Sequence, residues 1–458
     1  MFETLKNAFK SKEIRVKIWI TLALILVYRI GCYIPIPTFN MFAVTHSADT
    51  SDFLSILNVI TGGSMQNATL FALGVLPFIN SSIIMQLLAL VIPALEKMSK
   101  EGEEGRKKLT QITRIVAVVL AVVQAIGIVV AFRYINVSYV NDKGQQVSET
   151  LNGFATIFSF ESGAENPILT MALTIVMLVA GSVMVMWLSE RITEYGIGNG
   201  TSIIIFIGIL STAGTTMAES FKLVGNEWTY IWNIIGFILV VVAVLAFIVF
   251  MDGAERRITV QYSKQIKGNK MYGGQSTYIP IRVNGSGVMP IIFASSLLMF
   301  PQMIIQLFFS KTEAAVWYAQ YMGSGTAVYY VLLALFILGF SYFYAQIQFN
   351  PEDVSKNIQQ YGGFIPGIRA GKPTSDFLKK INNRITFFGA VFLMCLALIP
   401  TFIFRALAMG NGTWAAPALP FANSFSATGL LIVVSVALEL NKQLESQIMM
   451  KHYKGFLK

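Results

Sequence analysis

Ten long stretches of the chain contain almost no charged residue, and they constrain the fold more than any other feature. They are approximately Ile18–Pro37, Leu70–Leu95, Ile115–Phe132, Ile168–Leu188, Thr201–Met217, Trp228–Met251, Gly285–Phe309, Ala327–Tyr344, Ile385–Phe404 and Phe425–Leu440. A helix needs about 20 mainly apolar residues to cross the hydrocarbon core of a bilayer. Of the 458 residues, 55% are hydrophobic and only 13% are charged, whereas soluble domains contain about 25% charged residues. We therefore predict an all-α polytopic membrane protein with ten transmembrane helices.

The distribution of positive charge predicts how these helices are oriented. If the chain starts in the cytoplasm and the ten stretches cross alternately, the cytoplasmic segments carry 28 of the 34 lysines and arginines, and the outside segments carry five. Cytoplasmic loops of membrane proteins carry an excess of Lys and Arg, so we expect both termini to be cytoplasmic. No small-residue cleavage site follows Ile18–Pro37, and we expect this first stretch to stay in the protein.

Few residues are available for catalysis or for holding a metal ion. Cys32, Cys395, His46 and His452 lie far apart in the sequence, so they provide neither a disulfide framework nor the ligand spacing of a zinc site. An intramembrane enzyme would lack a candidate nucleophile. We therefore expect no enzymatic activity, no cofactor and no metal.

The only charged residues inside the ten stretches are Arg29 and Glu439. Each lies near an end of its stretch, where a long side chain can reach the interface with water. Ion-coupled transporters usually bury ionisable residues to bind the coupling ion. A secondary transporter for a small solute is therefore the second hypothesis. A channel driven by another component is the first.

The segments between the stretches suggest contacts with a membrane surface and with a soluble partner. Phe2, Leu5 and Phe9 recur at helical spacing between lysines, which favours an amphipathic surface helix over a frayed basic tail. The loops 252–284 and 348–384 are long and basic. They fit either docking of a soluble partner or a topology signal that only faces anionic lipid. In the first loop, a β-leaning stretch and a later Gly-Gly pair predict a hairpin-like protrusion.

One outside segment, residues 53–69, begins with apolar residues that are too few to cross a bilayer. Such a segment is either re-entrant or a helix on the outer surface, and its length favours a re-entrant element. An internal repeat is also visible, because Gly74–Ser82 resembles Gly287–Ser296 apart from one inserted residue. These copies open the second and seventh stretches. A repeat unit of five helices predicts two inverted halves, residues 1–217 and 218–458.

Six motifs in register resemble the bacterial SecY family, and the resemblance covers essentially the whole chain. They are Leu73–Leu88 (LGVLPFINSSIIMQLL), Glu101–Arg106 (EGEEGR), Ile192–Gly200 (ITEYGIGNG), Gln275–Pro280 (QSTYIP), Gly287–Ser296 (GVMPIIFASS) and Gly363–Gly371 (GFIPGIRAG). Members of this family form the central channel of the Sec protein translocase in the bacterial cytoplasmic membrane. The resemblance implies a central pore between two five-helix halves, through which unfolded preproteins pass. It also implies SecE- and SecG-like subunits, the SecA ATPase, the ribosome, signal sequences and membrane lipids as partners, without specific nucleic-acid binding.

The resemblance also implies roles for particular residues. The pore ring would be Ile79, Ile83, Thr201, Ile205, Ile292 and Ile432, and the plug at 53–69 would include Leu54, Ile56, Leu57, Ile60, Gly62 and Gly63. The lateral gate would include Ser82, Gln86, Ser295 and Ser296, and the residues that bind SecA or the ribosome would be Arg256, Arg257 and Arg369. Two positions depart from the family pattern, because Thr201 replaces the usual Ile and Ala370 replaces a Pro.

Overall fold

The computed structural model describes most of the chain. The described residues are 9, 11–40, 61–132, 135–140, 146–151, 153–154, 167–224, 230–262, 265–267, 270–272, 276–285, 287, 289–309, 312–323, 326–409 and 427–455. The amphipathic helix expected around Phe2 and Leu5, and the apolar residues 53–60, lie outside these ranges.

A long helix overlaps each of the ten predicted apolar stretches. These helices are α2 (Lys12–Gly31), α5 (Leu76–Val91), α7 (Glu103–Ala131), α8 (Pro167–Tyr195), α9 (Gly200–Val224), α10 (Tyr230–Asp252), α11 (Met289–Phe308), α13 (Ala327–Gln348), α15 (Lys372–Met409) and α17 (Ala427–Gly455). A shorter helix, α6 (Pro93–Lys100), connects α5 to α7.

Four helical segments among the described residues are long and apolar enough to cross a membrane unaided. They are Glu103–Val130, Ile168–Tyr195, Ala327–Gln360 and Lys372–Ile399. Further apolar helices in the described part are shorter, such as Leu76–Ala89 and Gly200–Thr215. The fold is therefore mostly helical with several membrane-spanning helices. The count of ten crossings stays a prediction, because length and composition support only part of it.

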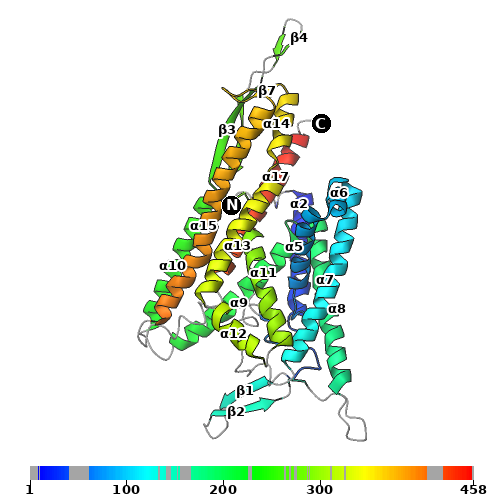
Figure 1. The fold of residues 1–458 in the computed structure, drawn as a ribbon, viewed down its shortest axis with the longest axis vertical. Helices are drawn as coiled ribbons and strands as arrows, with labels where there is room; N and C mark the ends of the chain where they lie inside the picture. Colours follow the sequence, from blue (N-terminus) through cyan, green and yellow to red (C-terminus); the bar gives the residue numbers. More distant parts are fainter. Residues whose placement is uncertain are drawn as a thin grey trace.

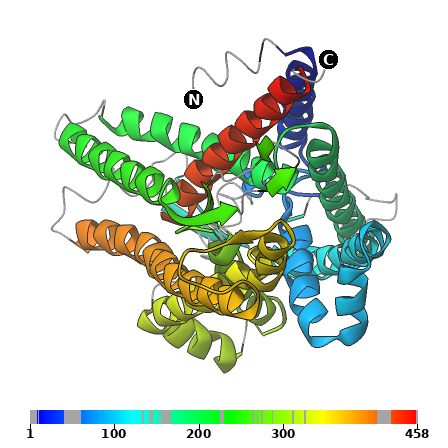
Figure 2. The ribbon, with the colours of Figure 1, turned by 90° about the horizontal axis from the view of Figure 1, so that it is seen from above.

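The long helices run side by side and enclose one extended core (Figure 1). From above, α2, α7 and α8 lie on one side of the molecule and α10 and α15 on the other (Figure 2). On the first side α7 packs against α5 and α8, and on the second α13 packs against α11 and α15. The two sides meet where α11 packs against α7 and where α17 packs against α9.

A small β-rich unit lies at one end of the bundle. Strand β3 (Glu255–Tyr262) pairs antiparallel with β6 (Ser276–Arg282), and β7 (Gly363–Phe364) adds to the other edge of β3. The strands β4 (Gln265–Lys267) and β5 (Lys270–Tyr272) form a second, smaller pair. The hairpin predicted in loop 252–284 is thus confirmed.

Helix α14 (Pro351–Gln360) and the start of α15 cover this unit. Its own hydrophobic core contains Val260, Ile281, Ile358 and Leu378. The loop 348–384 therefore folds onto loop 252–284 to form one compact unit. At the opposite end of the molecule lie α12 (Glu313–Met322) and the antiparallel strands β1 (Ile135–Val140) and β2 (Gln146–Leu151) (Figure 1).

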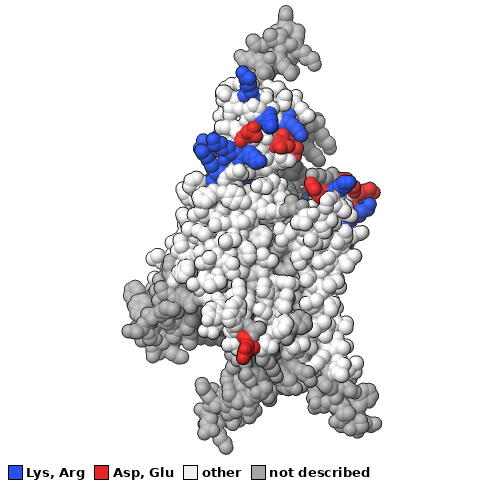
Figure 3. Space-filling model, viewed as in Figure 1, with Lys and Arg blue, Asp and Glu red and all other residues white. Residues whose placement is uncertain are grey.

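Charge is concentrated at the end of the molecule that carries the β-rich unit. On the face in Figure 3, lysines and arginines gather around β3 and α14, and a broad area below them is uncharged. Large apolar side chains are exposed along the helices, among them Leu26, Val119, Val176 and Val331. Exposed apolar surface of this extent indicates contact with lipid. The uncharged area is therefore the lipid-facing surface.

Candidate functional site

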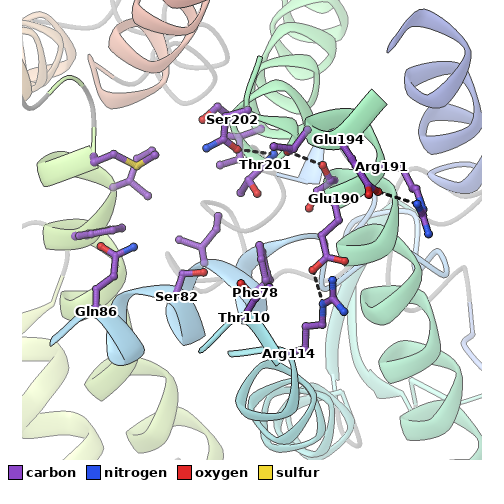
Figure 4. A pocket seen from close by; sticks show the side chains of 18 of the residues that line it. Phe78, Ser82, Gln86, Thr110, Arg114, Glu190, Arg191, Glu194, Thr201 and Ser202 are labelled. Atoms are coloured by element: carbon purple, nitrogen blue, oxygen red, sulfur yellow. Dashed lines mark hydrogen bonds and ion pairs between the residues drawn. The ribbon is translucent and has the colours of Figure 1, made fainter. Parts of the chain in front are cut away.

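A hollow of about 670 Å³ opens between helices from both sides of the molecule. Its lining residues are Phe78, Ile79, Ser82 and Gln86 of α5, Thr110 and Arg114 of α7, Ser189, Glu190, Arg191, Thr193 and Glu194 of α8, Asn199, Thr201, Ser202 and Ile205 at α9, Met289, Ile292 and Phe293 of α11, and Tyr344 of α13. In Figure 4 the charged pairs lie on one side of this hollow, with Ser82 and Gln86 on the other.

The charged side of the hollow, which we call the mouth, is built from two ion pairs. Arg114 Nε lies 2.7 Å from Glu190 Oε1, and Arg191 Nη1 lies 2.7 Å from Glu194 Oε2. All four side chains are partly exposed, so each pair contributes only about 0–1 kcal/mol to stability. They make this side of the hollow charged and polar.

A tight turn between α8 and α9 places Thr201 at the start of α9, beside the mouth. The Gly200 N–H donates to Thr193 Oγ1 at 2.8 Å, and the Thr201 N–H donates to Asn199 Oδ1 at 3.0 Å. A Cβ at residue 200 would lie 1.8 Å from the Ser189 carbonyl oxygen. This turn therefore requires glycine at position 200, the last residue of the ITEYGIGNG motif.

The inner part of the hollow ends on buried isoleucines, which we call the aliphatic layer. Its members are Ile79, Ile83, Ile205, Ile292 and Ile432, which are 3–9% exposed and belong to one hydrophobic cluster. Three of them, Ile79, Ile205 and Ile292, line the hollow together with Thr201. The structure thus places three isoleucines of the predicted ring and Thr201 in the hollow, and it places Ile83 and Ile432 in the same hydrophobic cluster. Their arrangement as a ring stays a prediction.

The four residues predicted for a lateral gate lie on α5 and α11. Ser82 and Gln86 line the hollow, Ser295 Oγ donates to the Ile292 carbonyl at 3.0 Å, and Ser296 is buried. A contact that the sequence did not indicate joins the two sides of the molecule here. The Tyr344 hydroxyl of α13 donates to Gln86 Oε1 of α5 at 2.6 Å.

The predicted plug falls partly outside the described residues. Leu54, Ile56, Leu57 and Ile60 lie in the undescribed range. Gly62 and Gly63 are described and have positive φ angles of 71° and 89°. Residues 61–75, which we call the entry segment, continue from there to α5 as a series of mostly buried turns.

The three predicted docking arginines belong to the β-rich unit. Arg256 and Arg257 lie on β3, where Arg257 Nε contacts Glu255 Oε1 at 2.8 Å and the guanidinium lies 4.9 Å from the Tyr278 ring centroid. The Glu255 hydrogen bond raises the pKa of Arg257, so its charge is permanent. Arg369 is exposed in the loop after β7, and its carbonyl accepts a 2.8 Å bond from Thr374 Oγ1. Since β7 pairs with β3, these arginines share one end of the molecule.

Comparison with known proteins decides the family. The SecY family model matches residues 69–441. The protein translocase subunit SecY of Streptomyces coelicolor is 40% identical to the chain over 465 residues, covering 100% of both sequences. The chain belongs to the SecY family. Its function is therefore that of a SecY protein-conducting channel subunit, which translocates proteins across the membrane as a transporter rather than an enzyme.

Solved structures confirm the SecY-like channel fold. A protein-conducting channel matches with a TM-score of 0.62 at 20% identity, over 94% of this chain and 92% of that one. A SecY structure whose plug domain stabilises the closed state of the channel and maintains a membrane seal matches with a TM-score of 0.56 at 18% identity, with the same coverage. Sec61 of the canine ribosome–channel complex matches with a TM-score of 0.58 at 19% identity, again over 94% and 92%.

The SecY-like hollow contains residues that sequence reasoning missed. In the sequence, the mouth residues Arg114, Glu190 and Arg191 contribute only to loop charge, and Tyr344 only ends an apolar stretch. A usable signal was present for Glu194, because it lies inside the ITEYGIGNG motif. Arg114, Glu190 and Tyr344 are identified by contacts over long sequence separations, which a single sequence does not report. Arg191 is identified by its place in the lining of the hollow.

Proposed function

We propose that this SecY-family chain is the pore-forming subunit of a ten-span channel with two exits. One exit leads across the membrane through the aliphatic layer, and the other leads sideways into lipid between α5 and α11. The two inverted halves would be residues 1–217 and 218–458, with both termini in the cytoplasm. The gathering of basic residues at the end that carries β3 and α14 supports this orientation.

The observation that carries the proposal is a charged mouth that leads to an apolar aliphatic layer. Below the mouth, the lining contains hydroxyl, amide and apolar side chains, and its described members include no carboxylate or ammonium. A hydrophobic constriction can exclude water and so block ions, and flexible aliphatic side chains can close around any passing peptide. A solute transporter would need buried ionisable groups for its coupling ion.

The Tyr344–Gln86 hydrogen bond supports a lateral gate at this place. Because α5 and α13 belong to opposite sides of the molecule, the bond must break when the two sides separate. A partly buried polar pair between the two sides stabilises closure, whereas an inserted hydrophobic signal sequence would replace it with apolar contacts. Ser82 and Gln86 on α5 and Ser295 and Ser296 on α11 would form the polar seam along which the gate opens.

The plug at 53–69 would close the outer side of the aliphatic layer. The plug domain of the matched SecY structure, which maintains a membrane seal, supports this role. The β-rich unit would bind SecA or the ribosome through Arg256, Arg257 and Arg369. The ribosome-bound Sec61 of the same fold supports the ribosome as a partner. The other proposed partners are SecE- and SecG-like subunits, signal sequences and lipids. The proposed location of the channel is the bacterial cytoplasmic membrane.

Crosslinking across the proposed gate tests this account. We expect the double variant Gln86→Cys and Tyr344→Cys to lose preprotein translocation and membrane-segment insertion when a short cleavable bis-maleimide joins the cysteines. Cleavage of the linker should restore both activities. Each single substitution, which adds one cysteine to the native Cys32 and Cys395, is the matched control under the same treatment. Full transport through a channel whose α5 and α13 are joined would refute the gate.

A further inference from the structure

Arg29 is a charged residue in a membrane-spanning helix, yet it has well-defined partners inside the protein. It lies on α2, about 26 Å along the helix from Lys12 at a rise of 1.5 Å per residue. The sequence predicted that its side chain would reach the interface with water. Its guanidinium also contacts two other parts of the chain. An ionisable residue at membrane depth is expensive and usually functional.

The guanidinium joins α2 to the entry segment and to α9. Arg29 Nη1 donates to the Gly62 carbonyl at 3.5 Å, and Arg29 Nη2 donates to Ser211 Oγ on α9. The preceding residue, Tyr28, donates from its hydroxyl to the Thr61 carbonyl at 3.4 Å. Two consecutive residues of α2 thus bind two consecutive carbonyls at the start of the entry segment.

The packing around Gly62 leaves no space for a side chain while these contacts are formed. Its φ is +71°, and a Cβ there would lie 2.7 Å from Arg29 Nη1 and 3.0 Å from the Cα of Gly208 on α9. Gly62 is therefore enclosed between the guanidinium and the backbone of α9. The neighbouring Thr61 and Ser64 are buried.

Position along α9 relates this junction to the aliphatic layer. Gly208 and Ser211 follow Ile205 by three and six residues, so Ser211 lies about 9 Å beyond Ile205 along the helix axis. Because α9 begins beside the mouth at Gly200, this displacement is away from the mouth. The junction of Arg29, Gly62 and Ser211 therefore lies on the outer side of the aliphatic layer.

Backbone chemistry explains why a charged group is useful there. Non-helical backbone at membrane depth persists only where protein or water satisfies its polar groups. The entry segment satisfies part of its own, since Ser64 Oγ donates to the Thr61 carbonyl and the Thr69 N–H donates to the Ser64 carbonyl. The Gly62 carbonyl receives its hydrogen bond from Arg29. A forked guanidinium presents two separate nitrogens to this carbonyl and to α9 in a fixed planar geometry, whereas a lysine would offer both acceptors a single nitrogen.

We propose that Arg29 is a positioning residue for the resting seal. Its guanidinium fixes residues 61 and 62 to α2 and α9, so that this described part of the proposed plug stays on the outer side of the aliphatic layer while the channel is closed. This inference rests on the proposed function, which assigns residues 53–69 to the plug. It adds an electrostatic anchor to a seal that is otherwise apolar.

The experiment compares resting ion leak with translocation in the same proteoliposomes, using the complete channel complex. We expect Arg29→Gln to raise the resting leak by about fivefold or more, because a change of only about 1 kcal/mol shifts a two-state ratio that far. Translocation of a preprotein with a strong signal sequence should remain within about twofold of the unaltered channel. Ser211→Ala, which keeps the charge and removes one partner, should raise the leak by a smaller factor. Arg15→Gln, an exposed arginine on the same helix, should change neither quantity.

Each outcome decides the inference. An unchanged leak in an Arg29→Gln channel that still translocates overturns it, and so does an equal leak in Arg15→Gln. If Arg29→Gln fails to assemble, Ser211→Ala decides, since an increased leak supports the anchor and an unchanged leak overturns it. Failure of the unaltered complex to translocate would instead refute the proposed function, which keeps the two failures distinct.

Discussion

Replacing Tyr344 by phenylalanine removes one atom from the proposed lateral gate and leaves the ring in place. The lost hydroxyl donates to Gln86 Oε1 at 2.6 Å, which is near the short end for O–H···O bonds. The ring still packs edge-on against Phe293, 5.1 Å between centroids. Tyr344→Phe therefore tests the hydrogen bond rather than the packing.

The expected size of the effect follows from hydrogen bonds between membrane helices. Such bonds contribute about 0.6 kcal/mol on average and at most about 1.7 kcal/mol. A value of about 1 kcal/mol for the Tyr344–Gln86 bond lies within this range. One kcal/mol changes the ratio of open to closed gates about fivefold. The gate should still close in the variant, but less firmly.

A series of preproteins whose signal sequences decrease in hydrophobicity measures this shift. We expect Tyr344→Phe to translocate the weakest signal sequences about fivefold more efficiently. Strong signal sequences, which open the gate in any case, should translocate unchanged. Tyr342→Phe is the matched control, because Tyr342 lies on the same helix and lines a separate surface hollow with Arg384 and Phe388. The reasoning fails if the weak signals gain nothing, or if the control gives the same gain.

Three further predictions address the aliphatic layer, the docking arginines and the β-rich unit. Ile292→Asn places an amide in the aliphatic layer and should raise ion conductance through the resting channel; unchanged conductance in a planar bilayer would contradict its position there. Arg369→Glu should reduce SecA-driven translocation about tenfold or more through charge repulsion, while membrane assembly of the channel, followed by blotting, stays normal. Leu378→Ala should destabilise the β-rich unit by about 2–5 kcal/mol, because this fully buried leucine leaves a cavity. Limited proteolysis should then cut loops 252–284 and 348–384 faster, and equal rates would refute the core assignment.

The helices and the hairpin were predictable because their signals are local. The length and hydrophobicity of an apolar stretch are enough to predict that it enters lipid. Likewise, the β-branched residues Ile258, Thr259 and Val260 favour a strand whatever their partner strand is. The glycine of the ITEYGIGNG motif is likewise local, since the turn at Gly200 forces it. Four of the six ring positions inferred from family resemblance line the hollow. The spacing of four residues between Ile79 and Ile83 would not by itself have indicated a pore.

The contacts that join these elements were not predictable, because they connect distant residues. Arg29 donates a hydrogen bond to Ser211, 182 residues away in the sequence, and Tyr344 donates one to Gln86, 258 residues away. Periodicity indicates which face of a helix is buried, but it does not name the partner on another helix. For this reason the sequence predicted neither the partners of Arg29 nor the hydrogen bond of Tyr344, which it marked only as the last residue of an apolar stretch.

Photocrosslinking of an arrested preprotein tests the central claim most directly. A photoreactive residue is placed in turn at Ile205 or Ile292 of the aliphatic layer and at Val176, which is 64% exposed on the lipid-facing side of α8. We predict that the mature part of an arrested preprotein is captured at Ile205 and Ile292, only when the preprotein is present, and not at Val176. Capture at Val176 without capture at either isoleucine would contradict a path through the aliphatic layer.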